Sequence, residues 1–300
     1  MTRSGFAAIL GRPNVGKSTL LNQMVGAKVS ITAPSPNTTR AAIRGVLTEG
    51  EVQIIFVDTP GLHRPRTTLG GRLNETARGA AGDVDVVMAV VEASSAIGPG
   101  DATTIATALD SAGAHGPIPL IVVNKVDRAS RAAVAAQLLG VAARVDELAA
   151  ERGAEAAAAR AEYFAVSART GEGVAALVAF VAAAMPESPF LYPDEEVSDV
   201  PEAVWVAELV REQLARKMHD ELPHAIHCRV TEFAWPRVTV EILVERESQK
   251  GMVIGKGGQL LKEVGSAARR QLPEGCFLEL RVSVERDWQS RAEILDRFGY

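Results

Sequence analysis

The sequence has few of the features that mark secreted, zinc-binding or membrane-spanning proteins. Its two cysteines, Cys228 and Cys276, show no CxxC spacing, so neither a disulfide framework nor a zinc site is expected. No apolar run approaches the ~18 residues that a membrane span requires, and the first residues do not form a signal-peptide pattern. These absences predict a soluble intracellular protein with two buried thiols.

A strong excess of one charge is also absent. The chain carries 32 basic and 37 acidic side chains, a net charge of −5, and this acidic balance taken alone argues against a nucleic-acid partner. Hydrophobic residues make up 47% and charged residues 23%, values near globular averages that exclude wholesale disorder. A length of 300 residues predicts two domains.

Short β-branched runs alternate with helical stretches in the first half of the chain. The expected strands are residues 6–10, 53–57, 84–91, 120–123 and 163–166. This alternation predicts an α/β fold with a doubly wound, mostly parallel sheet that binds its ligand at the carboxyl ends of the strands. The alanine-rich stretch 129–162 predicts one or two long surface helices without site chemistry.

A proline-rich and acidic segment divides the chain. Residues 186–201 contain four prolines and five acids without an amphipathic period, which predicts a linker between domains at 1–185 and 202–300. The second domain is expected to be a smaller α+β domain. Its pattern reads helix (203–218), strands (226–231 and 238–244), a glycine-rich turn, a helix to about 271 and a last strand (278–284).

A phosphate-binding motif follows the first strand. Residues 11–18 read GRPNVGKS, a complete GxxxxGK[ST] P-loop directly before an expected helix. Glycines let backbone amides surround the phosphates, Lys17 reaches the β and γ oxygens, and the Ser18 hydroxyl binds magnesium. The nucleotide-binding residues expected here are Gly11, Arg12, Pro13, Asn14, Val15, Gly16, Lys17, Ser18 and Thr19.

Three further motifs end later strands. In DTPG (58–61), Asp58 can hold magnesium through water and Gly61 can donate its amide to a γ-phosphate. In NKVD (124–127), Asp127 can accept both N1–H and the exocyclic amine of guanine, a donor pair that adenine lacks. The sequence SAR at 167–169 can close over the base. These motifs add Thr59, Pro60, Leu62, Asn124, Lys125, Val126, Ser167, Ala168 and Arg169 to the expected site.

The four motifs in this order resemble those of translation-factor-like GTPases. The segment SPNTTR at 35–40, together with Asn14 and Leu62, narrows the resemblance to the Era branch. The resemblance implies that Thr39 meets magnesium and the γ-phosphate, with Thr38 as the alternative, and that Asn14 helps to bind a potassium ion. Leu62 stands where many small GTPases carry a catalytic glutamine and cannot orient water, so a slow switch is expected; His63 is the alternative base.

A second glycine motif lies in the second domain. Residues 255–258 read GKGG, a GxxG turn before a helix, where a nucleic-acid strand can approach the backbone closely. Residues 246–270 carry six basic and two acidic side chains, so the acidic total conceals a local charge of +4. The expected RNA-binding residues are Gly255, Lys256, Gly257, Gly258, Lys250, Lys262, Arg269 and Arg270.

The order of elements around this turn resembles a type II KH domain, so the likeness to Era-type GTPases runs from Phe6 to Tyr300. It implies GTP and GDP binding with Mg²⁺, GTP hydrolysis, and binding to the 3′ end of small-subunit ribosomal RNA during maturation of the small ribosomal subunit. It also implies a cytoplasmic protein with loose peripheral association at the inner face of the cell membrane; a monomer is the default expectation.

Two other interpretations remain open at this point. A P-loop kinase or metabolic ATPase would share residues 11–18, although the NKVD sequence argues against it. A GTPase assembly factor whose KH-like domain binds protein rather than RNA is the second alternative.

Overall fold

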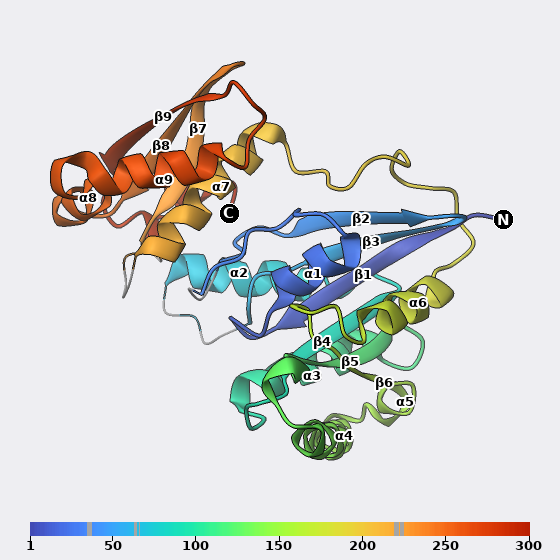
Figure 1. Ribbon diagram of the computed structural model, residues 1–300. Coiled ribbons are helices and arrows are strands. Elements are labelled where there is room, and N and C mark those ends of the chain that lie inside the picture. The colour runs from blue at the N-terminus through green and yellow to red at the C-terminus, as the bar shows by residue number, and fades with distance from the viewer. Residues whose placement is uncertain (35–37, 63–64, 66, 219–221, 223–224) are drawn as a thin grey trace. The chain divides into compact units, whose positions relative to one another are not determined.

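The computed structural model describes residues 1–34, 38–62, 65, 67–218, 222 and 225–300. The chain forms two compact units, which are taken one at a time below (Figure 1). Unit 1 comprises residues 1–30, 39–66 and 70–199, and unit 2 comprises residues 31–38, 67–69 and 200–300.

A six-stranded sheet forms the centre of unit 1. Its strands, in chain order, are β1 (Arg3–Gly11), β2 (Ile43–Glu49), β3 (Val52–Asp58), β4 (Val86–Glu92), β5 (Ile118–Asn124) and β6 (Glu162–Ala165). The spatial order is β2-β3-β1-β4-β5-β6, and every neighbouring pair is parallel except β2 with β3. The mostly parallel sheet is confirmed. Strand β2 was not predicted, because its sequence IRGVLTE shows no clean alternation of apolar and polar residues.

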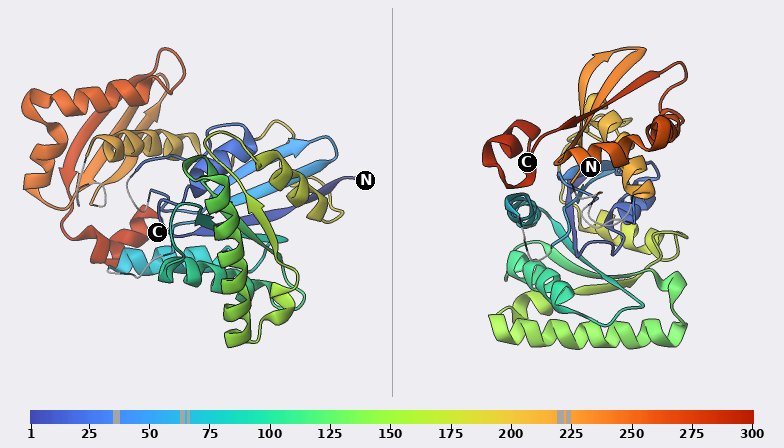
Figure 2. Two further views of the ribbon diagram at one scale, coloured as in Figure 1. Left: turned by 60° about the horizontal axis from the view of Figure 1, so that its bottom comes forward. Right: turned by 90° about the vertical axis from the view of Figure 1, so that its left-hand side faces the viewer.

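Helices cover both faces of this sheet. Helices α1 (Lys17–Val25) and α6 (Val174–Ala184) contact one face, and α3 (Pro99–Ala112), α4 (Arg131–Arg152) and the short α5 (Glu155–Ala158) contact the other (Figures 1 and 2). Helix α2 (Thr68–Gly79) follows the loop after β3. The doubly wound α/β architecture is therefore confirmed, and it places the loops that follow β1, β3, β5 and β6 at one edge of the sheet.

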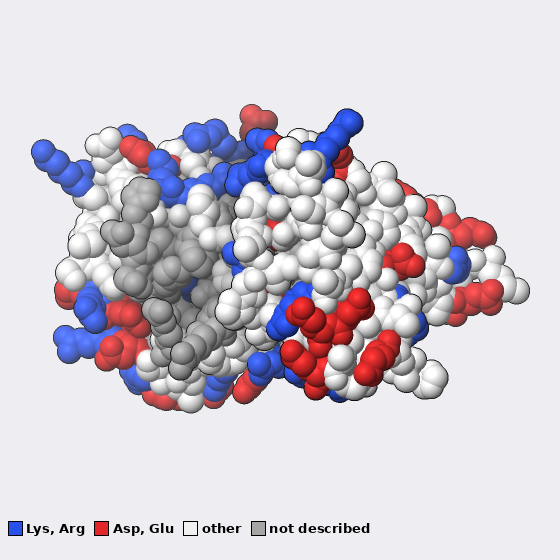
Figure 3. Space-filling view, turned by 90° about the horizontal axis from the view of Figure 1, so that it is seen from below, with Lys and Arg blue, Asp and Glu red and all other residues white. Residues whose placement is uncertain are grey.

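The alanine-rich segment forms α4 and α5, as its composition predicts. Val141, Val145 and Leu148 bury one side of α4 in the core, while most of its alanines are exposed. Figure 3 views the molecule from the side on which α4 lies, where uncharged side chains alternate with clusters of acidic and basic ones. The buried side chains of α4 therefore stabilise unit 1.

The proline-rich segment runs along unit 1. The backbone N–H of Ser4 donates to the Pro186 carbonyl at 3.1 Å, and that of Val46 donates to the Val197 carbonyl at 2.9 Å. Between them, the buried Gln53 side chain donates to the Tyr192 carbonyl at 2.9 Å. Residues up to Asp199 accordingly group with unit 1.

Unit 2 is a three-stranded sheet with helices packed against it. Its elements are α7 (Glu202–Lys217), β7 (His227–Ala234), β8 (Arg237–Val244), α8 (Glu247–Ile254), α9 (Gln259–Arg269), β9 (Phe277–Val284) and α10 (Ala292–Phe298). Strand β8 is antiparallel to β7 and parallel to β9, and α7 and α9 bury the apolar core against the sheet (Figure 1). Cys228 and Cys276 are both buried free thiols.

The expected element order of this second region needs one correction. Helix α8 lies between β8 and the glycine-rich turn, where the sequence analysis placed no helix. Its sequence ESQKGMVI buries a single residue, Val253, so it carries almost no apolar periodicity. The GxxG turn therefore joins two helices.

Candidate functional site

The P-loop connects β1 to α1. Gly16 has φ 99°, and a Cβ there would lie 2.5 Å from the Asn124 amide nitrogen, so only glycine fits this close approach. The Lys17 ammonium is buried and donates to the carbonyl of Gly11 at 2.9 Å and to that of Arg12 at 3.3 Å. The loop is thus wrapped around its own lysine.

The charges inside this loop are strongly perturbed. Burial lowers the pKa of Lys17 to about 8, although the nearby Asp58 carboxylate acts to raise it. Burial raises the pKa of Asp58, opposed by the charge of Lys17 and by hydroxyl hydrogen bonds. A buried cation and a buried anion side by side favour a ligand that supplies both phosphate oxygens and a metal ion.

Three hydroxyls converge on Asp58 at the end of β3. Its Oδ2 accepts hydrogen bonds from Ser18 at 2.7 Å, Thr39 at 3.0 Å and Ser30 at 3.1 Å. Its Oδ1 is buried and has no hydrogen-bond partner among the described residues. Hard oxygen donors around an unpaired carboxylate oxygen fit a magnesium ion. Ser30 was missed in the sequence because it belongs to no recognisable motif.

The structure distinguishes the two candidate switch threonines. The buried Thr39 side chain reaches both Ser18, at 2.9 Å, and Asp58. The carbonyl of Thr38 instead accepts a hydrogen bond from Arg211 within unit 2. Residues 35–37 of the segment SPNTTR lie outside the described residues.

The DTPG segment lies directly against the P-loop. The Thr59 hydroxyl donates to the Ile9 carbonyl at 2.8 Å, and the backbone N–H of Leu62 donates to the Gly11 carbonyl at 3.1 Å. The Leu62 side chain is buried, which agrees with an apolar residue that cannot orient water. His63, the alternative base, lies outside the described residues.

Asn124 joins three of the four motifs. Its side-chain nitrogen donates to the Val15 carbonyl at 2.8 Å, and its side-chain oxygen accepts the N–H of Ala168 at 3.0 Å. The neighbouring Lys125 donates to the Asn14 carbonyl at 2.7 Å. The P-loop, the NKVD segment and the SAR segment therefore form one hydrogen-bonded assembly. The other predicted residues, Pro13, Thr19, Pro60, Gly61 and Val126, lie in the same loops or in the first turn of α1.

Asp127 is poised as an ionised acceptor. The Ser167 hydroxyl donates to its Oδ1 at 2.6 Å, and Arg169 lies 2.7 Å from its Oδ2 as an ion pair without hydrogen-bond geometry. The bond from Ser167 and the charge of Arg169 lower the pKa of Asp127 against the effect of burial. Because Arg169 is 69% exposed, its pairing is weak, and guanine N–H groups can replace it.

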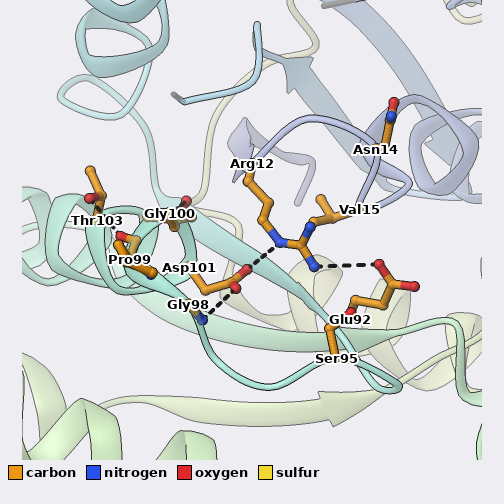
Figure 4. Close-up of polar contacts among 12 residues, drawn as sticks. Arg12, Asn14, Val15, Glu92, Ser95, Gly98, Pro99, Gly100, Asp101 and Thr103 are labelled. Carbon is orange, nitrogen blue, oxygen red and sulfur yellow. Dashed lines mark hydrogen bonds and ion pairs between the residues drawn. The ribbon is translucent and has the colours of Figure 1, made fainter. Parts of the chain in front are cut away.

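Two carboxylates outside the four motifs also touch the P-loop. The Arg12 guanidinium lies between Asp101, in the first turn of α3, and Glu92, at the end of β4 (Figure 4). The place of Glu92 at the site could have been predicted from the sequence, because Glu92 ends a strand of the same parallel sheet as Asp58 and Asn124.

In unit 2, the GxxG turn has the conformation that its glycines predict. Gly255, Gly257 and Gly258 all have positive φ, and a Cβ on Gly255 would lie 2.7 Å from that of Leu260. Lys256 and Gly257 are exposed, and the first turn of α9 has no side-chain cap. Within the turn the Gly258 N–H donates to the Gly255 carbonyl and the Gln259 N–H to that of Lys256, so what the turn offers an anion is its exposed Lys256 side chain.

The basic run around this turn is divided by the fold. Lys250 lies in α8, and the exposed Lys262 lies in the first turn of α9, next to the GxxG turn. Arg269 and Arg270 are at the other end of α9, roughly 15 Å away along the helix axis. The local charge of +4 is therefore spread along α8 and α9.

Within the described part of the chain, no cluster of three His, Cys, Asp or Glu side chains forms a metal site. None of the helices described is long and apolar enough to cross a membrane.

Comparison with known proteins covers both units. The family model described as 50S ribosome-binding GTPase matches residues 6–125, and the one described as KH domain matches residues 210–289. The chain is 45% identical to GTPase Era of Mycobacterium bovis (strain BCG / Pasteur 1173P2) and of Mycobacterium tuberculosis (strain ATCC 25177 / H37Ra) over 309 residues. These alignments cover 99% of this chain and 98% of each relative.

Solved structures agree with these matches. A crystal structure of Era in complex with MgGDPNP and nucleotides 1506–1542 of 16S ribosomal RNA has a TM-score of 0.87 at 33% identity, covering 100% of this chain and 99% of that one. A variant of Aquifex aeolicus Era bound to GDP·AlF4⁻ gives the same TM-score, identity and coverage.

Proposed function

Because the chain belongs to the Era family of GTPases and is itself a GTPase, we propose that it acts as a GTP-driven switch on ribosomal RNA. Its target would be the 3′ end of small-subunit ribosomal RNA, and its role would be to assist maturation of the small ribosomal subunit. The observation that carries the nucleotide part is the hydrogen-bonded assembly of the P-loop, NKVD and SAR segments around Asn124.

We assign nucleotide binding to the predicted residues of the P-loop, DTPG, NKVD and SAR segments. Asn124 would hold the loops in register, Lys17 would bind the β- and γ-phosphates, and Asp127 would select guanine. Competition with labelled GTP tests the base selectivity: unlabelled GTP should displace it and ATP should not. Equal displacement by ATP would favour the kinase or ATPase interpretation.

Magnesium would be held by Ser18, Thr39 and Asp58. The unpaired, buried Oδ1 of Asp58 beside two hydroxyls supports this assignment, as does the magnesium nucleotide in the Era complex. When bound, the ion would supply positive charge that neutralises charge developing on the phosphates during hydrolysis. The chain's own part is to fix the donors and to exclude water around the buried Lys17 and Asp58.

The switch segment supports a route from the nucleotide to unit 2. The backbone N–H of Thr32 donates to the fully buried Glu212 at 2.9 Å, and Arg211 donates to the Thr38 carbonyl. The next residue, Thr39, bonds Ser18 and Asp58. We infer that hydrolysis changes the contacts of Thr39. Because Thr39 follows Thr38 directly in the chain, this change moves the segment that is hydrogen-bonded to α7 and repositions the RNA-binding region.

We also propose a potassium ion at Asn14. This exposed P-loop residue has φ 66° and carries a neutral amide oxygen suited to a monovalent cation. Such an ion would supply positive charge where other GTPases use an arginine, which would compensate for the apolar Leu62.

The potassium proposal predicts a cation-dependent rate. Hydrolysis in potassium chloride should be about tenfold faster than in sodium chloride at equal ionic strength, and Asn14→Ala should remove the difference. Single-turnover GTP hydrolysis in the two salts measures this. Equal rates for the wild type would remove the basis for the ion, and a retained difference in the variant would locate it elsewhere.

The RNA-binding part of the proposal is supported by the GxxG turn between α8 and α9. Gly255, Lys256, Gly257 and Gly258 would clamp the sugar-phosphate backbone, with Lys250 and Lys262 beside them and Arg269 and Arg270 further along the strand. The KH match and the Era complex with 16S ribosomal RNA support RNA over a protein partner.

Acidic substitutions in the turn test this clamp. Lys256→Asp and Gly257→Asp should each weaken binding of an RNA oligonucleotide with the sequence of the 16S 3′ end by about tenfold or more, measured by fluorescence anisotropy and crosslinking. Gly140→Asp adds the same charge to open space on α4 and should leave RNA binding unchanged. Undiminished binding by both turn variants would show that GxxG is not the clamp and would favour a protein partner.

Domain boundaries, oligomeric state and cellular location complete the proposal. We propose the domain boundaries 1–185, 186–201 and 202–300, a monomer, and a cytoplasmic location with loose peripheral association at the inner face of the membrane. The proposed ribosomal RNA partner supports the cytoplasmic location.

A further inference from the structure

A ring of charged contacts joins Arg12 of the P-loop and Lys125 of the NKVD segment to two carboxylates that lie outside the four motifs; Figure 4 shows the contacts of Arg12 with Asp101 and Glu92. The Arg12 guanidinium donates to Asp101 at 2.9 Å and lies 3.5 Å from Glu92. Glu92 also pairs with Lys125 at 3.0 Å, and Lys125 donates to the Asn14 carbonyl at 2.7 Å. The ring closes through the backbone from Asn14 back to Arg12, so Glu92 connects the phosphate-binding and guanine-binding loops, while Asp101 holds Arg12 from α3.

The ring holds two strained backbone positions together. Asn14 and Lys125 have φ angles of 66° and 64°, and they are the described non-glycine residues of unit 1 with positive φ. Side chains rarely adopt this conformation unless the surroundings impose it. The Lys125 ammonium bonds the Asn14 carbonyl directly, so release of Lys125 from Glu92 loosens both positions.

The ring is sheltered from solvent, which strengthens it compared with a surface ion pair. The side chain of Asp101 is 4% exposed and that of Glu92 is 15% exposed. Burial acts to raise the pKa of Glu92, but the bond to Lys125 and the charges of Lys125 and Arg12 outweigh it and lower the pKa. Glu92 is therefore ionised and paired with two cations.

We propose that Glu92 and Asp101 are positioning residues that set the lifetime of the bound guanine nucleotide. They would hold Arg12 and Lys125 so that the P-loop and the NKVD loop are preformed before binding. Neither carboxylate is hydrogen-bonded to Ser18, Thr39 or Asp58, so the groups proposed to hold magnesium do not depend on them. The inference rests on the nucleotide site proposed above.

Dissociation of a fluorescent methylanthraniloyl-GDP from the full-length protein tests the proposal. We expect Glu92→Gln and Asp101→Asn to release it about tenfold faster than the wild type, because a charge-assisted contact to the loop is lost. In sodium chloride, where the potassium ion proposed at Asn14 does not contribute, the single-turnover rate of GTP hydrolysis should be unchanged. Glu92→Asp keeps the charge on a shorter stem and should restore part of the lifetime.

Asp110→Asn is the matched control, because Asp110 also lies on α3 and pairs with an arginine, Arg152, but at the surface. It should leave the dissociation rate unchanged. Asp101 also accepts the N–H of Gly98 and so supports the start of α3; if Asp101→Asn lowers the melting temperature, Glu92→Gln decides alone. Any of three results would overturn the proposal. Glu92→Gln could release the nucleotide at the wild-type rate, Asp110→Asn could accelerate release as much as Glu92→Gln does, or Glu92→Gln could hydrolyse bound GTP in sodium chloride more slowly than the wild type. Binding of the fluorescent nucleotide by the wild type tests the underlying site separately.

Discussion

Asp127→Asn is expected to turn a guanine-nucleotide site into one that prefers xanthine nucleotides. The Asp127 carboxylate, held by Ser167, presents two acceptor positions to the two N–H donors of guanine. An amide presents one acceptor and one donor, so one contact is lost and two donors face each other. At about 1.5 to 3 kcal/mol for each hydrogen bond to a charged group, GDP affinity should fall by about 10- to 200-fold. Xanthine carries an oxygen in place of the exocyclic amine and restores the match.

Equilibrium titration with fluorescent GDP and XDP measures this exchange. Asp146→Asn, an equal change at an exposed position on α4, should alter neither affinity. If Asp127→Asn still binds GDP as tightly as the wild type, or loses both nucleotides equally, Asp127 does not read the base.

Lys17→Met should reduce nucleotide binding most of all. The methionine keeps the length of the side chain, but it removes the buried ammonium that bonds the Gly11 and Arg12 carbonyls and that would bind two phosphates. Loss of two charge-assisted contacts of about 1.5 to 3 kcal/mol each lowers GDP and GTP affinity by about two to four orders of magnitude. Isothermal titration with each nucleotide gives the two values.

The folded state should lose stability as well. Burial lowers the pKa of Lys17 to about 8, but removal of its ammonium leaves the buried Asp58 carboxylate without a counter-charge and the Gly11 and Arg12 carbonyls without their donor. We therefore expect a lower melting temperature without nucleotide, and binding is measured well below that temperature. Arg152→Gln, at an exposed pair between α3 and α4, is the control and should bind GDP normally. Tight GDP binding by Lys17→Met would contradict the assigned role.

Much of unit 1 could be predicted because its motifs end strands of one parallel sheet. Asp58 ends β3 and Asn124 ends β5, and the parallel register brings these ends to the edge where Gly11 ends β1. The family and the doubly wound fold were therefore correctly predicted from local sequence. Elements without a clean period were missed: β2 has no regular alternation, and α8 buries only Val253.

Contacts between distant residues could not be predicted. No local pattern announces that Ser30 reaches Asp58, or that Glu92 and Asp101 pair with Arg12 some 80 and 89 positions earlier in the chain. The choice of Thr39 over Thr38 also depends on which side chain turns toward Ser18. Helix α8 was also not predicted, because its single buried residue gives no periodic apolar signal.

The sequence by itself determined the family and predicted the chemistry: the P-loop, DTPG and NKVD motifs, taken together, predict binding of phosphate, magnesium and guanine. The tertiary structure alone decided how those residues are held. The unpaired oxygen of Asp58, the lowered pKa of Lys17 and the ring through Glu92 all arise from burial and from contacts between strands far apart in the chain. Burial and long-range contact are properties of the folded chain, and no local stretch of sequence contains them.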